Sequence, residues 1–239
     1  MKSTFLLAAA LMLGAAAPVQ AQRKARKAAS EAPQSVATTR LQPLFGGLTP
    51  TQAEQALGAA TIRSLAGSFA SRAEASRFFS TKGYEYLAEN QRDTAAYRFN
   101  LAWVLDPANP DAYHGLGIVA SSAPTPDQAI DLLKTGLDLS PDNSFLLSDL
   151  GASYLIRYEQ SKKKKDLTTA SELLQKATAR DAANATAWQQ LARAYYYQES
   201  YAQAWEAVHK GQGSSLAAVD FSLVADLLAK LPDPEGKFK

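Results

Sequence analysis

The sequence contains no cysteine among its 239 residues and only two histidines, His114 and His209. The missing thiols exclude disulfides, thiol catalysis and thiolate metal sites, and two histidines are too few for a multi-histidine metal centre. The formal net charge is +2, which is too balanced for a protein that holds nucleic acid by bulk charge. We therefore expect no cofactor, no metal ion and no nucleic-acid partner.

The remaining composition is that of a folded protein. Hydrophobic residues make up 46% of the chain and charged residues 20%, which argues against wholesale disorder. The length allows one or two domains with a core that needs no covalent cross-links.

The first residues have the pattern of an export signal. Lys2 precedes an apolar run over residues 5–17, and a small-x-small cleavage pattern ends at Ala21. This order predicts a signal peptide over residues 1–21 and an exported protein, either periplasmic or secreted. The alternative is an uncleaved anchor, but the run is shorter than the roughly 20 residues that span a bilayer. We expect no membrane span after cleavage, because no later stretch is long and apolar enough.

Residues 22–43 are polar and carry four basic side chains between positions 23 and 27. They could form a basic arm that touches an acidic lipid surface or polymer. Because no aromatic residues interleave and no apolar face forms, we favour a disordered, solvated linker.

The chain repeats itself with a period of 34 residues. Gly83, Gly117 and Gly151 are 34 apart, as are Pro107 and Pro141. The frame resumes after a shift of seven residues, which places an insertion at about 156–169.

Within each period the key positions have helical spacing. Tyr113, Gly117 and Ala120 stand at i, i+4 and i+7, so they share one helix face. A second helix in each period alternates small and large residues in the same way. Nothing indicates a strand, so we predict an all-α protein.

A 34-residue pair of helices with these large, small and proline positions resembles the tetratricopeptide repeat (TPR). The resemblance implies a right-handed α-solenoid of about four helix pairs over residues 71–231. An N-terminal helical cover over 44–70, a capping helix over about 217–231 and a tail over 232–239 complete the prediction. The expected units are 76–109, 110–143, 144–184 with the insertion, and 185–218.

In similar repeat proteins the first helix of each pair lines a concave groove that grips ligands. Mapped onto this sequence, the groove positions that we select are Arg77, Tyr84, Asp111, His114, Ile118, Phe145, Gln189, Arg193 and Tyr196. Tyrosine and phenylalanine offer apolar anchors, and the two arginines could pair with a carboxylate. Ser80 and Tyr84 replace the Lys and Asn of the carboxylate-clamp subtype, so we reject that subtype.

The insertion carries a basic loop of four lysines, Lys162, Lys163, Lys164 and Lys165. It could grip an acidic partner, but we favour a self-repelling solvated loop that follows a prolonged helix.

Catalytic motifs are missing from the sequence. His114 has Asp111 three residues earlier, which could orient its ring, yet no nucleophile accompanies it. We expect His114 to be a satisfied surface histidine and His209 to be exposed.

These observations predict a non-catalytic scaffold, adaptor or assembly factor in the cell envelope. Its partner would be a segment of an unidentified protein or peptide held in the concave groove. Two alternatives remain: a glycan-binding or catalytic accessory protein, and a structural module that self-associates. The sequence leaves the oligomeric state open.

Overall fold

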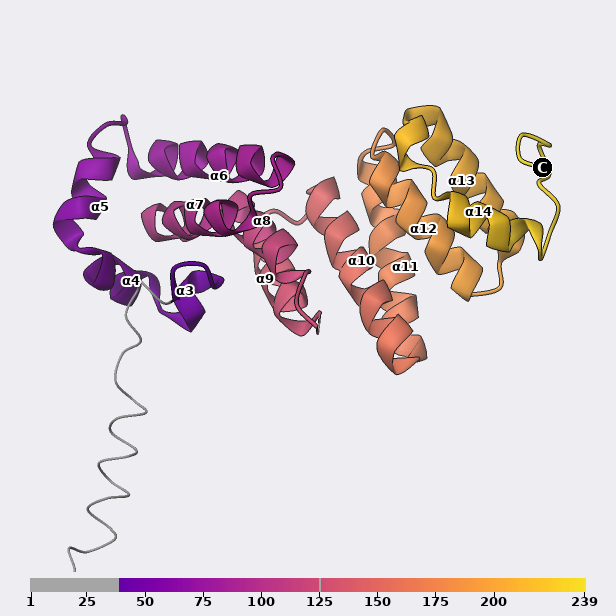
Figure 1. Ribbon diagram of the computed structural model, residues 1–239, viewed down its shortest axis with the longest axis horizontal. Helices are drawn as coiled ribbons and strands as arrows, with labels where there is room; N and C mark the ends of the chain where they lie inside the picture. The colour runs from indigo at the N-terminus through magenta and orange to yellow at the C-terminus, as the bar shows by residue number, and fades with distance from the viewer. Residues whose placement is uncertain (1–38, 125) are drawn as a thin grey trace, which may run out of the picture. The chain divides into compact units, whose positions relative to one another are not determined.

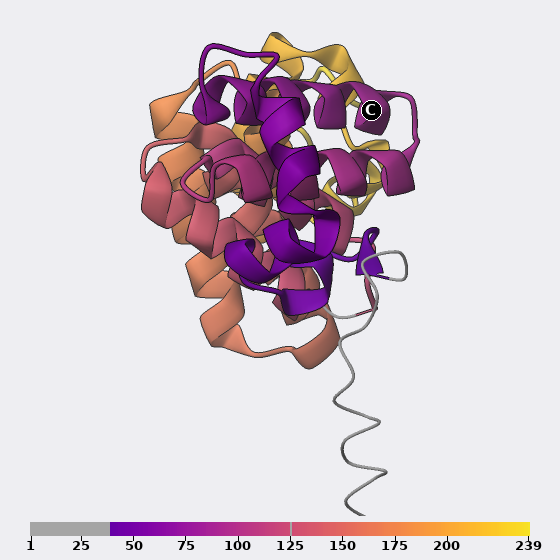
Figure 2. The same ribbon diagram turned by 90° about the vertical axis from the view of Figure 1, so that its left-hand side faces the viewer.

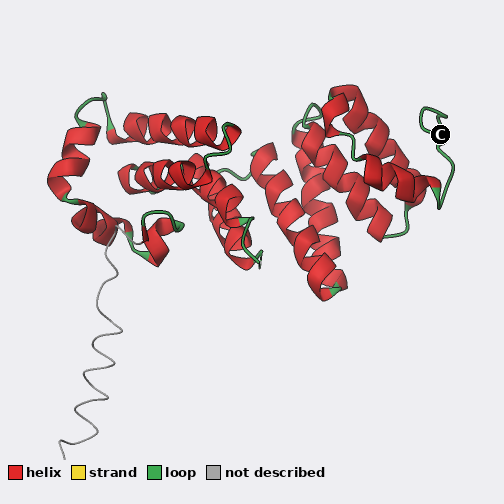
Figure 3. Ribbon diagram, in the orientation of Figure 1, coloured by secondary structure: helices red, strands yellow, loops and turns green. Residues whose placement is uncertain are grey.

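The computed structural model describes residues 39–124 and 126–239 (Figure 1). The predicted signal peptide over 1–21 and the linker residues 22–38 lie outside this part of the chain. The described residues belong to one compact unit, residues 36–239. All their regular structure is helical, which confirms the all-α prediction (Figure 3). Among the described helices, none has the length and apolar character that crossing a bilayer requires.

From residue 39 onward, three short helices precede the repeats and cover the first pair (Figure 2). They are α3 (Leu44–Gly47), α4 (Pro50–Leu57) and α5 (Ala59–Ala66). Thr49 begins α4 with a complete capping box, because its side chain accepts from the Gln52 amide while the Gln52 side chain accepts from the Thr49 amide. Phe45 and Ile62 bury their side chains in one cluster with Phe79 of the first pair. The predicted N-terminal cover is therefore present.

Four helix pairs follow, and each pair packs against the next (Figure 1). Their helices are α6 (Arg72–Ala88) and α7 (Arg92–Leu105), α8 (Pro110–Ala120) and α9 (Asp127–Leu139), α10 (Ser144–Ser161) and α11 (Lys164–Arg180), α12 (Ala185–Tyr197) and α13 (Tyr201–Ser214). Asparagine or serine caps begin several of them, as at Asn109, whose side chain accepts from the Asp111 amide at 3.0 Å.

Small residues set the distance between the two helices of a pair. A Cβ atom added at Gly83 would lie 2.6 Å from the ring of Phe99, and one at Gly117 would lie 2.6 Å from Cγ of Leu133. In both pairs the partners are sixteen residues apart in the sequence. Large residues thus fill the space that glycine leaves, and the predicted frame of the repeat is confirmed.

The insertion lengthens two helices instead of forming a loop. In the third pair the corresponding partners are Gly151 and Leu174, which are seven residues further apart than in the first two pairs. Helix α10 has 18 residues and α11 has 17, against 11 and 13 in α8 and α9. Only Lys162 and Lys163 connect them, and Lys162 turns the chain with a left-handed φ of 55°. The longer first helix was expected, but the prediction of a solvated loop over the rest of the insertion is wrong.

A last helix, α14 (Phe221–Leu228), follows the 3₁₀ turn η1 (Leu216–Ala218) and covers the fourth pair. Leu223, Val224 and Leu227 are buried against that pair. Phe221, at the first turn of the helix, is 63% exposed. Its ring centre lies 6.5 Å from that of Phe238.

The chain beyond α14 folds back onto α13. The imidazole of His209 stacks against the rings of Trp205 and Phe238, which also stack against each other. Its Nε2 lies 3.0 Å from Oδ1 of Asp233 and its Nδ1 lies 3.0 Å from Oε1 of Glu235. The expectation of an exposed His209 is wrong, because the tail buries the ring and pairs it with two carboxylates.

The end of the predicted linker also belongs to the folded part. Thr39 is buried, and the Asn100 side chain on α7 donates from Nδ2 to the carbonyl oxygens of Arg40 and Gln42, at 2.9 and 2.8 Å. The boundary that the sequence placed at residue 43 therefore lies too late in the chain.

Candidate functional site

The first helices of the four pairs, α6, α8, α10 and α12, together form what we call the first-helix surface. A chain of hydrogen bonds runs across three of them. The hydroxyl of Tyr84 on α6 lies 2.8 Å from Nδ1 of His114 on α8, and Nε2 of His114 lies 2.8 Å from Oδ2 of Asp149 on α10. These contacts join three consecutive repeat units.

The direction of this chain follows from its ends. An ionised carboxylate can only accept hydrogen bonds, so Nε2 of His114 carries a proton and donates a hydrogen bond to Asp149. In a neutral imidazole Nδ1 then accepts from the Tyr84 hydroxyl. Burial raises the pKa of Tyr84, and the negative charges of Asp111 and Asp149 raise it further. Tyr84 therefore keeps its proton, and its hydroxyl has two acceptors within reach, Nδ1 of His114 at 2.8 Å and the backbone carbonyl of Asp111 at 3.3 Å.

Next to this chain the surface is hollowed between α8 and α10. The cavity measures 160 Å³ and is bordered by Ile118, Ser121, Ala152 and Ile156, with the carboxylate of Asp149 at its wall. The Asp149 side chain is 33% exposed, whereas only 10% of the His114 side chain is. The arrangement presents an oriented negative charge beside apolar side chains. Such a site can bind a cationic or hydrogen-bond-donating group together with an aliphatic one.

Comparison with solved structures of similar backbone identifies this architecture. PilF of Pseudomonas aeruginosa superposes with a TM-score of 0.55 over 66% of this chain and 70% of its own, at 24% identity. A thermophilic TPR protein of Thermus thermophilus gives a TM-score of 0.54 over 67% of this chain and 93% of its own, at 17% identity. The chain has the TPR fold. No protein-family model matches the sequence, and no curated protein matches it either.

A larger assembly contains the same fold over more of the chain. One chain of the APC/C Cut9–Hcn1 hetero-tetramer matches over 89% of this chain and 39% of its own length, with a TM-score of 0.53 and 18% identity. At these identities the likeness concerns the backbone. The chemistry of the site has to come from this chain's own side chains.

The TPR frame brings part of the predicted groove together. Tyr84, Asp111, His114 and Ile118 lie around the hydrogen-bond chain and its cavity. His114 is satisfied, as expected, but it is buried and held by Tyr84 and Asp149 instead of Asp111. The side chains of the neighbouring repeat units, Tyr84 and Asp149, occupy both ring nitrogens of His114. Asp111 instead accepts from the Tyr84 hydroxyl through its backbone carbonyl.

Asp149 was not among the residues selected from the sequence. It stands 35 residues after His114, which is one period plus one. Residues one period apart occupy equivalent places on neighbouring helices, so a shift of one position brings their side chains into reach. Pairing polar residues at the period plus or minus one would have found this contact.

Two predicted residues lie free on the same surface. Phe145, at the start of α10, is 58% exposed, and Arg77 on α6 is exposed as well. An exposed phenylalanine is available as an apolar anchor for a ligand.

The fourth unit differs, because its predicted arginine is already paired. The guanidinium of Arg193 binds the carboxylate of Asp220, which also caps α14 by accepting from the Ser222 and Leu223 amides. Its Nη1 lies 3.8 Å from Oε1 of Glu159 on α10. Arg193 thus ties α12 to its neighbours on both sides, and its charge is neutralised within the chain.

The other predicted residues of the fourth unit have structural contacts too. Gln189 borders a small cavity beside Asp220, and the ring of Tyr196 packs against the rings of Tyr197 and Tyr201. The Tyr197 hydroxyl donates to Glu159. Burial and this carboxylate raise the pKa of Tyr197 to about 12.

The four lysines of the insertion are all exposed. Lys162 and Lys163 join α10 to α11, and Lys164 and Lys165 form the first turn of α11. The ammonium of Lys162 lies 5.5 Å from the centre of the Tyr158 ring. Among the described residues no group of three histidine, aspartate or glutamate side chains could hold a metal ion.

Proposed function

We propose that this chain is a non-catalytic scaffold that binds a segment of a partner protein along its first-helix surface. The segment carries an aliphatic side chain that enters the cavity beside Ile118 and Ile156. A lysine, an arginine or another donor next to that side chain pairs with Asp149. The role is that of an adaptor or assembly factor.

One observation carries this proposal: the Asp149 side chain is partly exposed, and a hydrogen bond of 2.8 Å from Nε2 of the buried His114 to its Oδ2 fixes its orientation. A side chain that is fixed before binding loses little conformational freedom when the ligand arrives. The buried Tyr84–His114 pair therefore supports a specific contact, since a freely rotating surface aspartate would bind less tightly.

The place of action belongs to the proposal as well. We infer from the apolar run over residues 5–17 and the cleavage pattern ending at Ala21 that the protein is exported into the cell envelope. There a scaffold without cysteine is unaffected by oxidising conditions.

Photo-crosslinking in the native envelope tests the proposal. A photoreactive phenylalanine analogue replaces Phe145 on the first-helix surface, and the same analogue at the exposed Lys134 on α9 serves as the control. We expect one protein adduct from position 145, identified by mass spectrometry, and none from position 134. Equal adducts from both positions would refute the proposed surface. An adduct formed only between two copies of this chain would favour a self-associating module instead.

A further inference from the structure

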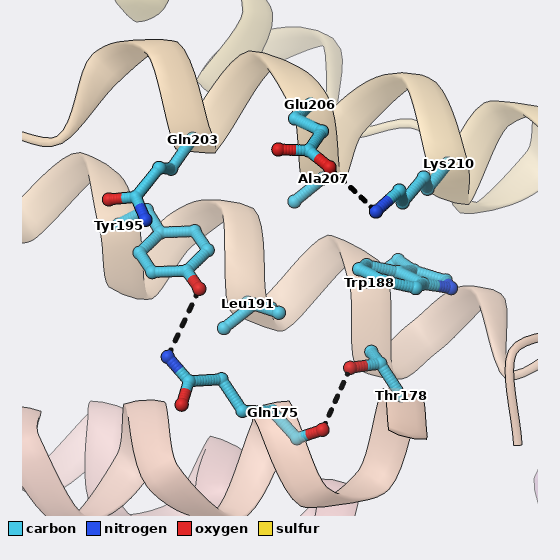
Figure 4. A pocket seen from close by; sticks show the side chains of 9 residues that line it. All are labelled: Gln175, Thr178, Trp188, Leu191, Tyr195, Gln203, Glu206, Ala207 and Lys210. Carbon is cyan, nitrogen blue, oxygen red and sulfur yellow. Dashed lines mark hydrogen bonds and ion pairs between the residues drawn. The ribbon is translucent and has the colours of Figure 1, made fainter. Parts of the chain in front are cut away.

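Two further grooves occupy equivalent places in the repeat. One lies between α11 and α13, has α12 as its floor and encloses 210 Å³ (Figure 4). Its walls include Gln175, Trp188, Tyr195, Gln203, Glu206 and Lys210. In Figure 4, Trp188 and Tyr195 lie at opposite ends of the groove with Leu191 between them. We call it the α11–α13 groove.

The second groove encloses 320 Å³ and lies beside α8 and α9. Its helical wall is made of the residues that stand 75 positions earlier, which is two periods and the seven-residue insertion. Tyr113 thus takes the place of Trp188, Gln128 that of Gln203, Asp131 that of Glu206, Leu132 that of Ala207 and Thr135 that of Lys210. Because Gln42, which lines this groove, accepts a hydrogen bond from Asn100 of α7, we call it the α7–α9 groove.

The backbone confirms that the two walls are equivalent. A Cβ atom added at Gly136 of α9 would lie 3.3 Å from Cβ of Tyr113, and one added at Gly211 of α13 would lie 3.2 Å from Cβ of Trp188. Each glycine thus lets the second helix approach the aromatic residue of the first helix to the same distance. The two grooves are built from the same parts in the same positions.

The two grooves differ in what covers them. The α7–α9 groove is lined on its remaining side by the chain's own residues Gln42, Pro43, Leu44, Gly46 and Gly47. Nδ2 of Asn100 donates to the carbonyl oxygens of Arg40 and Gln42, which fixes this segment by its backbone. Leu44 packs against the cluster that contains Phe99 and Leu132. The segment is therefore held by a side-chain amide, by Leu44 and by Phe45, which is buried in the cluster with Ile62 and Phe79.

The residue that corresponds to Asn100 in the α11–α13 groove is Gln175, again 75 positions later. Its Nε2 donates to the hydroxyl of Tyr195 at 3.0 Å (Figure 4). Among the described residues only α11, α12 and α13 line this groove, and the bond to Tyr195 leaves the second N–H of the Gln175 amide as a donor for a ligand. The groove has the donor and the apolar surface that hold a segment elsewhere in the fold, and no such segment within the described residues.

We propose that the α11–α13 groove binds a short segment of another protein, as the α7–α9 groove does with residues 40–47, which form a turn and helix α3. A backbone carbonyl of the segment accepts from the Gln175 amide, and an aliphatic side chain lies on Trp188. This site shares no lining residue with the cavity beside Asp149, so it adds a second partner-binding site to the proposed function.

The geometry favours a different protein, and not a second copy of this chain, as the source of the bound segment. The chain's own segment is already seated, with Phe45 only 1% exposed, so a second copy could supply it only by unfolding its own groove. The rim also favours an uncharged segment. Lys210 lies 4.9 Å from the centre of the Trp188 ring, and Glu206 pairs with it at 2.7 Å, so the two charges cancel.

The chain supplies a probe for this groove, because residues 40–47 show what the equivalent groove accepts. A synthetic octapeptide of that sequence, Arg-Leu-Gln-Pro-Leu-Phe-Gly-Gly, is titrated into the full chain by calorimetry. We expect saturable binding at one site. Replacing the leucine at the peptide's fifth position with aspartate should abolish it, because a charge cannot occupy an aromatic floor.

Two variants of the exposed face of α11 test the contact. Gln175→Ala should weaken peptide binding about threefold to tenfold, the effect of one lost hydrogen bond. Glu172→Ala, one turn earlier and equally exposed, should leave it unchanged. A photoreactive leucine at the peptide's fifth position should attach to α11–α13. Absence of binding up to about 1 mM, equal affinity of the two variants, or attachment to α8 and α9 or the first-helix surface would each overturn the proposal.

Light scattering separates the two sources of the segment. We expect a mass that does not depend on concentration. A dimer that Gln175→Ala abolishes would assign the groove to a second copy and refute the inferred source. None of these outcomes depends on Asp149, so this proposal and the proposed function fail separately.

Discussion

Nε2 of His114 lies 2.8 Å from Oδ2 of Asp149, and the two residues belong to different repeat units. A buried ring of the second unit thus orients a partly exposed carboxylate of the third. Since Tyr84 of the first unit supports the ring from the other side, three units contribute to one position of the first-helix surface.

Removing the Tyr84 hydroxyl should destabilise the fold. In Tyr84→Phe, Nδ1 of His114 loses its donor in a buried place, which costs about 1–3 kcal/mol. Urea unfolding measures the loss. Tyr86→Phe on the same helix is the control, because no described residue bonds to the Tyr86 hydroxyl, and it should change the unfolding free energy by less than about 0.5 kcal/mol. Equal effects of the two variants would mean that the hydrogen-bond chain contributes nothing.

Gly117→Ala should also destabilise the chain, because its Cβ would lie 2.6 Å from Cγ of Leu133. Overpacking of this kind costs about 1–3 kcal/mol. The matched control is Gly213→Ala in α13, where an added Cβ meets nothing within 4 Å. That variant should be neutral or more stable by up to about 1 kcal/mol, since alanine favours helix over glycine. A stable Gly117→Ala protein would contradict the assigned repeat frame.

Arg193→Ala should loosen the C-terminal end, because Asp220 at the start of α14 would lose its cationic partner and keep only its amide donors. A double-mutant cycle with Asp220→Asn measures the coupling, which we expect at about 1–3 kcal/mol for a partly buried charged pair. If instead the single variants add without coupling, Arg193 is free to serve a ligand.

The tail should detach at low pH. Burial of Asp233 raises its pKa, but the amides of Phe238 and Glu235 and the nearby His209 outweigh burial, so the net pKa lies below the ordinary 3.8. Its ionised form stabilises the fold above that value, and this contribution is lost as the pH falls further.

Asp233→Asn tests this assignment, since Oδ2 accepts from the Lys237 and Phe238 amides and asparagine lacks that acceptor. The variant should be about 1–3 kcal/mol less stable than the wild type at pH 7. The difference between the two proteins should shrink below about pH 4. A difference that stays constant with pH would show that the charge has no part in holding the tail.

The proposed export signal can be tested directly on the mature protein. N-terminal sequencing of the protein isolated from the envelope or medium should begin at Gln22, because the cleavage pattern ends at Ala21. A mature protein that retains Lys2 would contradict the predicted signal peptide.

The sequence predicts the helix pairs and their register, because glycine and large residues recur with one period and the packing depends directly on both. The insertion shows where this reasoning stops. A run of four lysines indicates a solvated loop by charge alone, yet the helix that contains Lys164 and Lys165 is extended by packing further along it, where Asp166 is buried and binds Arg157 at 2.8 Å.

The candidate site was only half predictable for a related reason. The frame placed Tyr84 and His114 on the first-helix surface, but the contacts that orient them cross from one unit to the next. Arg193 illustrates the same limit: its partner Asp220 lies 27 residues later, outside the repeat pattern, so nothing in the periodicity pairs them. Local spacing predicts the face on which a side chain lies, whereas its partner depends on tertiary packing.

The most direct test of the account is the affinity of the crosslinked partner segment for two variants. Asp149→Asn keeps the volume and can still accept from His114 but loses the charge, so we expect affinity to fall about tenfold or more, as for one charge-assisted hydrogen bond. Asp138→Asn, an exposed acid on α9, should leave the affinity unchanged. Equal affinities for wild type and both variants would contradict binding at the first-helix surface.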